Sequence, residues 1–201
     1  MKLNRFTHSS AHLFSNLFSP PAVAATLGFI VAWQEHPFWA GTLRATLYGA
    51  LTCLVPLAMV IYLVKIGRVG DIHMSLSPQQ RRIPYLVGFL GALLAFILFY
   101  LWGDSPLLTA LAACNVLGLG ALGLINNFWL ISNHTASAML VAVFSAYVFG
   151  WQTGLWLLLL VGLVVWSRWQ LGKHTFSQLV AGLLVGAAPV ILLANLGFLV
   201  S

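Results

Sequence analysis

Two histidines and two basic residues in the last third of the chain have side chains that could do chemistry together. His134 and His174 each stand just before or at the predicted start of an apolar helix, and Arg168 and Lys173 closely precede His174. A helix N-terminus presents unpaired N–H groups and a partial positive charge, and therefore favours bound anions. Two helix starts, two imidazoles, a guanidinium and an ammonium predict a pocket for a phosphate group. For either histidine alone the alternative is an interfacial residue bonded to a neighbour, and the matching positions of the two favour the pocket.

The elements that must position these residues are membrane helices. Of the 201 residues, 61% are hydrophobic and 6% are charged, whereas about a quarter of the residues in soluble domains are charged. Such a chain cannot cover itself with a hydrated surface, so we predict an integral, multi-pass membrane protein. The predicted fold class is all-α, a polytopic membrane helix bundle of six to seven transmembrane helices with an N-terminal interfacial helix. Residues 1–201 are predicted to form a single integral membrane domain.

Apolar runs separated by turn-forming residues predict where the helices lie. Several runs are shorter than the roughly 20 residues that a straight span needs, so the predicted count stays open between six and seven. Ser132 and Thr135 are predicted caps that aim a hydroxyl or an amide group into the phosphate pocket. The predicted spans are 21–35, 41–66, 83–102, 106–129, 135–151, 153–167 and 175–199.

The N-terminal segment, residues 1–19, has a pattern of its own ahead of the bundle at 20–201. Its large apolar residues recur at roughly helical spacing, with Ser9, Ser10 and Asn16 between them. This pattern predicts a short amphipathic helix that lies in the membrane interface. A disordered tail is the alternative.

The basic residues are distributed unequally between the two sides of the predicted bundle. With seven spans, one face carries eight of the nine Lys and Arg residues, and the other face carries only Arg44. The positive-inside rule places the cation-rich face, and with it the phosphate pocket, in the cytoplasm. Topology, or else an anionic substrate, accounts for the excess of positive charge, so no nucleic-acid partner is expected. The eight residues are Lys2, Arg5, Lys65, Arg68, Arg81, Arg82, Arg168 and Lys173.

Two short motifs around the histidines resemble those of a known family. Ser167-Arg168, five further residues, His174, three further residues and Gln178 are similar to the third motif of the type 2 phosphatidic acid phosphatase (PAP2) family, Ser-Arg-x5-His-x3-Asp. The stretch "ISNH", residues 131–134, resembles the second motif, Pro-Ser-Gly-His, and retains Ser132 and His134. A predicted helical hairpin separates the two motifs, as it does in that family.

The resemblance implies a membrane lipid phosphatase that works through a phosphohistidine and needs no metal or other cofactor. His174 would attack phosphorus, and His134 would protonate the leaving alcohol and then activate water. Arg168 would hold the phosphate oxygens, with the Ser132–Asn133 region donating further hydrogen bonds, and Lys173 stands beside His174 as a further phosphate-binding candidate. The substrate would be a phosphomonoester or diphosphate of a membrane lipid, of the phosphatidate or polyprenyl diphosphate type. Phosphoryl transfer needs mainly positioning and cations around the developing charge, and this residue set supplies both.

Three departures from the family pattern keep a second reading open. Gln178 stands where the family has the Asp that orients the nucleophile, and its amide oxygen, one helical turn from His174, could still accept the imidazole N–H. "ISNH" has lost the Pro and the Gly of the second motif, and the first motif, Lys-x6-Arg-Pro, is absent before it. The alternative function is therefore a catalytically impaired relative that binds a lipid phosphate or a membrane partner without turnover. A transporter or channel is a weaker alternative, because the polar groups cluster at one face rather than at mid-span.

Arg81 and Arg82, at the end of the predicted loop 67–82, are candidates to replace the missing cations. The chain returns to the same face at His134 two spans later, so either arginine could reach the phosphate. Alternatively, both anchor the loop and serve topology. The oligomeric state is left open.

Overall fold

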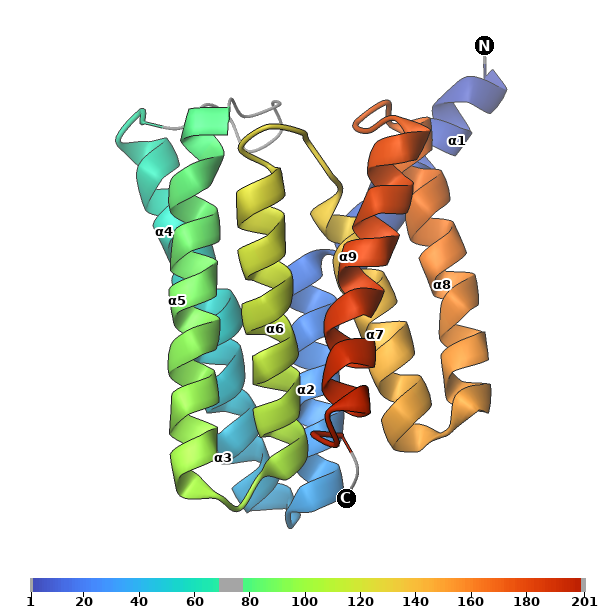
Figure 1. Ribbon diagram of the computed structural model, residues 1–201. Coiled ribbons are helices and arrows are strands. Elements are labelled where there is room, and N and C mark those ends of the chain that lie inside the picture. The colour runs from blue at the N-terminus through green and yellow to red at the C-terminus, as the bar shows by residue number, and fades with distance from the viewer. Residues whose placement is uncertain (1, 69–77, 200–201) are drawn as a thin grey trace.

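The computed structural model describes residues 2–68 and 78–199, apart from the side chains of residues 2–8 and 78–81. This part of the chain consists of helices joined by turns and loops and contains no strand, which confirms the predicted all-α fold class. Figure 1 shows the helices running side by side as a bundle, with the N-terminal helix projecting from one end. The helices are α1 (Lys2–Leu17), α2 (Pro20–Glu35), α3 (Phe38–Gly49), a π-helical segment η1 (Ala50–Leu54), α4 (Val55–Lys65), α5 (Pro78–Trp102), α6 (Pro106–Ile125), α7 (Asn133–Phe149), α8 (Trp151–Gln170) and α9 (Phe176–Asn195).

Five helices in the described ranges are long and apolar enough to cross a membrane. They are the continuous helix Phe38–Lys65, which comprises α3, η1 and α4, then Arg82–Trp102 within α5, and α6, α8 and α9. A sixth span results if Ser9–Leu17 of α1 and α2, which meet at an angle of 42°, are counted as one broken span. α7 is apolar but has only 17 residues, fewer than the roughly 20 of a straight span. A multi-pass membrane protein follows from these lengths.

The helices lie close to the predicted spans, with two differences that concern the site. α6 ends at Ile125 rather than at 129, because the side chain of Asn126 accepts the backbone N–H of Ile131 and holds the following residues in a loop. Arg81 and Arg82 were predicted to lie at the end of a loop. This prediction is wrong, because α5 begins at Pro78 and both residues lie in its first turns.

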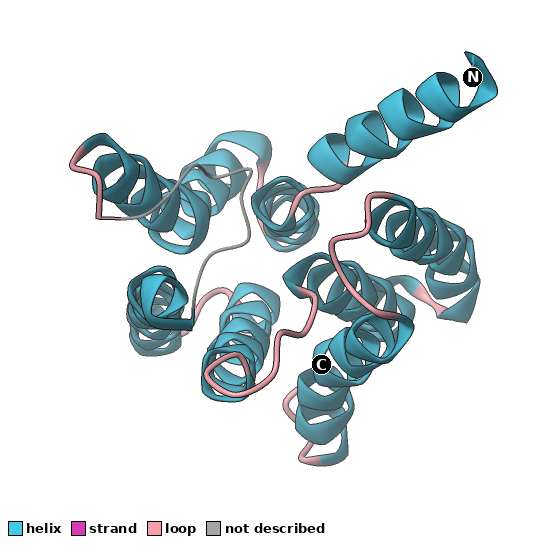
Figure 2. Ribbon diagram, turned by 90° about the horizontal axis from the view of Figure 1, so that it is seen from above, coloured by secondary structure: helices cyan, strands magenta, loops and turns pink. Residues whose placement is uncertain are grey.

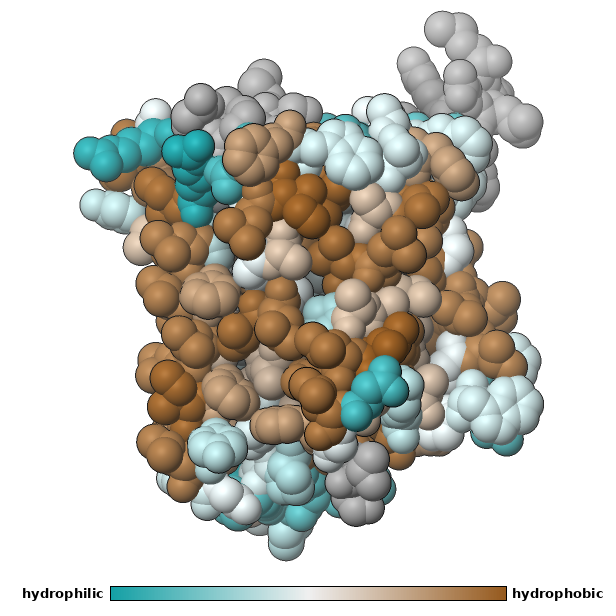
Figure 3. Space-filling model, viewed as in Figure 1, coloured by the Kyte–Doolittle hydropathy of each residue, from teal (hydrophilic) through white to brown (hydrophobic). Residues whose placement is uncertain are grey.

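The outer surface of the bundle is apolar around its middle. Figure 3 shows a broad hydrophobic band between two ends at which polar residues gather. Large side chains in this band, such as Leu90, Leu94 and Leu184, are more than half exposed. In water such a surface would be unstable, whereas in a bilayer it faces lipid tails.

Two groups of helices meet at α2, which packs against α3, α6 and α7. On one side α5 packs on α6, and on the other α7 packs on both α8 and α9. The largest fully buried side chains in the core between the groups are Tyr48, Phe99 and Phe144. The predicted site residues on α7, α8 and α9 thus all belong to one tightly packed group.

The end of the bundle opposite the predicted site is held by the two described carboxylates. Both oxygens of Glu35, at the end of α2, accept backbone N–H groups at the start of α6, from Leu107 at 2.6 Å and Leu108 at 3.3 Å. Asp104, in the turn before α6, pairs with Arg44 of α3. Neither carboxylate is therefore available to the site at the other end.

Candidate functional site

The N-terminus of α7 is formed by the motif around His134. Ser132 is the N-cap, as predicted, and its hydroxyl oxygen accepts the backbone N–H of Thr135 at 3.4 Å. Asn133 and His134 are the first two residues of the helix, where N–H groups have no intrahelical partner. Thr135, which we had also predicted as a cap, is not one: it lies inside the helix and its hydroxyl donates to the carbonyl of Leu179 in α9 at 3.1 Å.

The N-terminus of α9 lies immediately after His174. Thr175 is its N-cap and forms a capping box with Gln178. The Thr175 hydroxyl accepts the Gln178 N–H at 3.4 Å, and the Gln178 side-chain oxygen accepts the Thr175 N–H at 2.9 Å. The Gln178 side-chain oxygen therefore caps the helix. The prediction was that this oxygen accepts the N–H of the His174 imidazole. The pattern Thr-x-x-Gln before an apolar run is a known signature of this cap, and it could have been recognised in the sequence.

Close packing between α7 and α9 places the two helix starts side by side. The Ser132 N–H donates to the Gln178 carbonyl at 3.3 Å, which joins the two N-termini directly. Further along, Gly182 and Gly186 face α7 so closely that a Cβ atom on Gly186 would collide with the carbonyl of Ala136. The two glycines let the helix backbones approach, as small residues do between membrane helices.

Arg168 reaches the same region from the end of α8. The hydroxyl of Ser167 is fully buried and donates to the Val164 carbonyl at 2.9 Å, which anchors the last turns of the helix. Gly172, with φ of 61°, takes the left-handed conformation that the tight turn between α8 and α9 requires. Arg168 is half-buried, and its Nε has no hydrogen-bond partner among the described residues. A buried guanidinium N–H without an acceptor is a free donor for an anion.

The three groups of the predicted phosphate pocket lie together. Arg168 and His174 are close enough to His134 for their charges to interact with it. The three come from three elements, α8, the turn before α9, and α7. Lys173 is half-buried next to His174, and its backbone N–H donates to the Arg168 carbonyl at 3.2 Å. Asn133 is engaged within α7, where its side-chain oxygen accepts the Ser137 hydroxyl at 3.4 Å.

A residue of α1 also belongs to this cluster, and the sequence did not reveal it. Nη1 of Arg168 donates to the Ser15 hydroxyl at 3.0 Å, and the Ser15 backbone carbonyl lies against His134 as a hydrogen-bond acceptor. Ser15 is only 4% exposed, and Phe14 beside it packs edge-on against Trp166 of α8. Figure 2 shows α1 side-on, with its N-terminal end extending away from the other helices. The C-terminal part of α1 therefore contacts the site through Ser15, and the predicted N-terminal helix is confirmed as a helix.

Arg82 lies in a different environment from the cluster. Its Nε donates to the side-chain oxygen of Asn127 at 2.8 Å. The cavity that it lines is formed by α5, α6 and the residues after α6, and none of its lining residues is His134, Arg168 or His174. The side chain of Arg81 lies outside the described residues.

Among the described residues, no group of three or more His, Cys, Asp or Glu side chains is arranged to hold a metal ion. The cluster of two imidazoles and a guanidinium at two helix N-termini instead has the chemistry of an anion site. Fold and site together define a polytopic helical membrane protein with a cluster of two imidazoles and a guanidinium at one end of the bundle.

Comparison with known families agrees with this definition. The family model of the PAP2 superfamily matches residues 122–199, a range that contains Ser132, His134, Arg168, His174 and Gln178. The C-terminal region of the chain is therefore similar to the PAP2 superfamily, in agreement with the resemblance of the two motifs. The superfamily is generally one of phosphoesterases, and the match favours phosphatase-type activity on lipid phosphates as the coarse functional class. No curated protein and no solved structure matches the chain.

Proposed function

We propose that the chain is a membrane lipid phosphatase that hydrolyses a lipid phosphomonoester or diphosphate through a phosphohistidine on His174. The observation that carries this proposal is the meeting of His134, Arg168 and His174 at the paired N-termini of α7 and α9. A guanidinium and two imidazoles are thus gathered next to the two helix N-termini. Transfer of a phosphoryl group depends mainly on such positioning and on neutralisation of charge.

In the first step, a nitrogen of the His174 imidazole forms a bond to phosphorus while the bond from phosphorus to the lipid oxygen breaks. His134 gives its proton to the leaving oxygen, which departs as an alcohol or as the shortened phosphate. In the second step, His134 takes a proton from water, and the resulting hydroxide attacks phosphorus as the phosphorus–nitrogen bond breaks. Inorganic phosphate leaves, and both histidines return to their starting protonation states.

The cations have distinct roles in this scheme. Arg168 holds the equatorial oxygens, and its free Nε is one donor that a phosphate would satisfy. Ser15 occupies Nη1 of Arg168 in this structure, so an incoming phosphate must share or displace that hydroxyl. Lys173 and the N-terminus of α7, where Ser132 and Asn133 stand, add positive potential, and the scheme requires no metal.

Phosphate release tests the proposal directly. We expect the purified full chain in detergent, with EDTA present, to release phosphate from at least one member of a panel that includes phosphatidate and a polyprenyl diphosphate. The substitution His174→Ala should reduce release to a few per cent or less while the thermal unfolding temperature stays near that of the wild type. Undiminished release by His174→Ala would exclude the nucleophilic role.

The intermediate gives a second, independent test. With an aryl phosphate, whose leaving group needs no proton, His134→Ala should still be phosphorylated but should hydrolyse the intermediate slowly. A labelled, acid-labile and base-stable phosphoprotein is then expected for His134→Ala and not for the double variant with His174→Ala. If the label appears in the double variant, His174 is not the phosphorylated residue.

A phosphate-binding relative without turnover is the second candidate function. It is favoured by one observation, namely that the position of the orienting carboxylate holds Gln178, whose oxygen is engaged by Thr175. This candidate would be supported if the wild type binds lipid phosphate but releases no phosphate from any substrate, and if Arg168→Ala abolishes the binding.

A further inference from the structure

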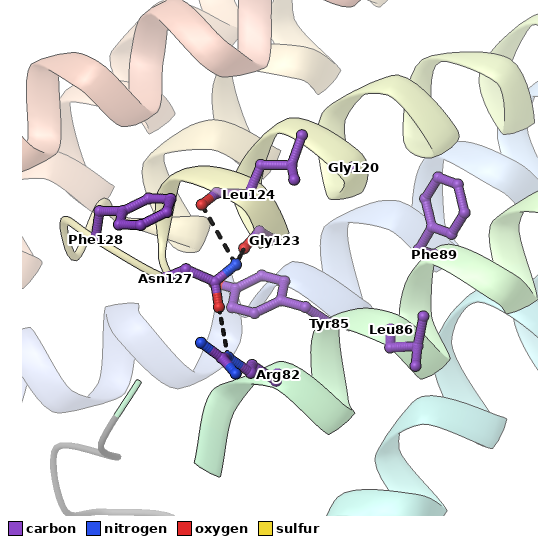
Figure 4. Close-up of a pocket in the computed structure, with 9 residues that line it drawn as sticks. All are labelled: Arg82, Tyr85, Leu86, Phe89, Gly120, Gly123, Leu124, Asn127 and Phe128. Carbon is purple, nitrogen blue, oxygen red and sulfur yellow. Dashed lines mark hydrogen bonds between the residues drawn. The ribbon is translucent and has the colours of Figure 1, made fainter. Parts of the chain in front are cut away.

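A groove on the lipid-facing surface between α5 and α6 is separate from the cluster at α7 and α9. Its volume is about 580 Å³, within the range of roughly 300–1,000 Å³ that is usual for small-molecule sites. Figure 4 shows Arg82 and Asn127 at one end and the ring of Phe89 toward the other. The lining residues are Arg82, Tyr85, Leu86, Phe89, Gly120, Gly123, Leu124, Asn127 and Phe128.

Two glycines of α6 form the floor of the groove. A Cβ atom on Gly120 would lie 3.4 Å from the ring of Phe89, and one on Gly123 would lie 3.5 Å from Cβ of Tyr85. These are tight to ordinary contacts, so a methyl group would just fit, and a larger side chain at either position would extend into the groove. The groove is therefore a consequence of residue choice on α6.

The wall of the groove faces the hydrocarbon of the bilayer. Leu86 and Leu124 are 55% and 70% exposed, and both lie within candidate membrane spans. A depression in a lipid-facing surface is filled by lipid chains, because an empty one would forfeit the dispersion contacts of its lining. One part of the occupant is thus an alkyl chain.

The open end of the groove carries a positive charge that no described carboxylate neutralises. Arg82 is the first residue of its membrane span and is exposed. Asn127 accepts the Arg82 Nε–H and is itself fixed by donating to the Gly123 carbonyl at 2.8 Å. This arrangement holds the guanidinium plane while its two Nη groups remain for another acceptor, and a planar pair of N–H donors suits a phosphate.

We propose that this groove binds one anionic membrane phospholipid, with its phosphate on Arg82 and an acyl chain along Gly123, Gly120 and Phe89. A cation at the membrane margin above an apolar trough complements the two parts of such a lipid. The site is distinct from the proposed catalytic cluster and does not depend on turnover there.

Native mass spectrometry of the purified full chain tests the proposal with two probes, a phosphatidylglycerol and a phosphatidylcholine with identical acyl chains. A basic residue near a membrane surface favours an anionic lipid by about fivefold. We therefore expect the wild type to retain one phosphatidylglycerol about fivefold better than phosphatidylcholine. Equal retention of the two lipids by the wild type would overturn the role of the headgroup.

Matched variants separate this groove from general surface charge. Arg82→Gln should reduce the preference to about one, whereas Arg68→Gln, which removes an exposed cation outside the groove, should leave it unchanged. Equal effects of the two substitutions would mean that the preference belongs to the whole basic face.

Filling the trough tests the acyl chain separately. Gly120→Leu should lower the retention of both lipids severalfold, while Gly162→Leu on α8, where a Cβ meets nothing within 4 Å, should not. Glycerol 3-phosphate, which carries the headgroup chemistry without chains, should not displace the lipid. Unchanged retention in Gly120→Leu, or displacement by glycerol 3-phosphate, would contradict the proposal.

Discussion

At the residue scale, Gln178 decides how the proposed nucleophile is supported. An amide cannot stabilise a protonated imidazole as a carboxylate does, and the Gln178 oxygen is already engaged in the cap of α9. In serine proteases, replacing the carboxylate behind the catalytic histidine by an amide lowers kcat by about four orders of magnitude. The site is therefore expected to be slow if it turns over.

A charge-restoring substitution at this position tests that expectation. Gln178→Glu retains the Thr-x-x-Glu form of the capping box and adds a negative charge at a helix N-terminus, so helix stability should not fall. We expect kcat for phosphate release to rise at least tenfold with little change in KM, because the added charge acts on the imidazolium that develops during reaction.

Two further variants at the same position serve as controls. Gln178→Asp has the same charge on a shorter side chain and should also raise kcat, whereas Gln178→Leu should lose the cap, at about 1 kcal/mol of stability, without gaining activity. A higher KM with unchanged kcat in Gln178→Glu would show that the position acts on binding and not on the nucleophile.

At the element scale, the contact between α7 and α9 builds the site. The backbones approach because Gly186 has no side chain, and the Ser132 N–H then reaches the Gln178 carbonyl. A wider separation would move His134 away from His174 without altering either residue. The geometry of the cluster therefore depends directly on how closely α7 and α9 pack.

The matched pair Gly186→Ala and Gly162→Ala tests this link. Gly186→Ala forces a Cβ against the Ala136 carbonyl, so we expect a loss of roughly 1–3 kcal/mol and a large decrease in phosphate release. Gly162 has open space around it, and alanine there should be neutral or stabilise the helix by about 0.5–1 kcal/mol. Thermal unfolding in detergent and phosphate release are the measurements, and similar behaviour of the two variants would contradict the packing argument.

The turn between α5 and α6 offers a pH-dependent contact at the opposite end. The hydrogen bond from Arg44 is the largest cause that lowers the pKa of Asp104. A lowered folded-state pKa means that the stabilisation is fully present above the ordinary Asp value of about 3.9, and it is lost as the pH falls through the folded-state value. Because Asp104 is 44% exposed, the effect on the free energy of unfolding should be small.

Thermal unfolding of the wild type and Asp104→Asn between pH 7 and pH 3 measures this contribution. The wild type should unfold at a slightly higher temperature at pH 7, and the difference should shrink as the pH approaches 3. A difference that grows on acidification would mean that Asp104 is not stabilised as the anion.

At the scale of the whole molecule, the charges are divided between the two ends of the bundle. Lys65, Arg68, Arg82, Arg168 and Lys173 lie at or next to the helix ends on the side of the cluster (Figure 1), and Arg44 is at the other end with Asp104. From the positive-inside rule we predict that the cluster faces the cytoplasm, and the proposed phosphatase activity would then act on the inner leaflet.

Cysteine labelling of intact cells tests this orientation. The native Cys53 and Cys114 are buried, so a single introduced cysteine gives the signal. A membrane-impermeant maleimide should label Gln152→Cys from outside, and Gln170→Cys, at the other end of α8, only after the cells are opened. Labelling of Gln170→Cys in intact cells would place the site outside the cytoplasm.

Much of the local structure could be predicted from the sequence. Apolar runs and turn residues located the bundle helices of the described residues from α2 to α9, and the motifs located His134 and His174 at helix starts. These features depend on residues that are close in sequence, because the backbone of a membrane helix must satisfy its hydrogen bonds within that helix. Helix ends were less well predicted, as at Pro78 and Ile125, since single side chains such as Asn126 decide them.

By itself, then, the sequence determined the class of protein, its helices and which residues stand at their ends. Only the tertiary structure decided which of these residues meet. The Ser15 contact with Arg168 joins residues 153 positions apart, and Arg82 meets Asn127 rather than the histidines. Such pairings depend on how complete helices pack, and small residues such as Gly182 and Gly186 influence this packing as much as charge does. The order of residue types along the chain does not specify the distances between packed helices.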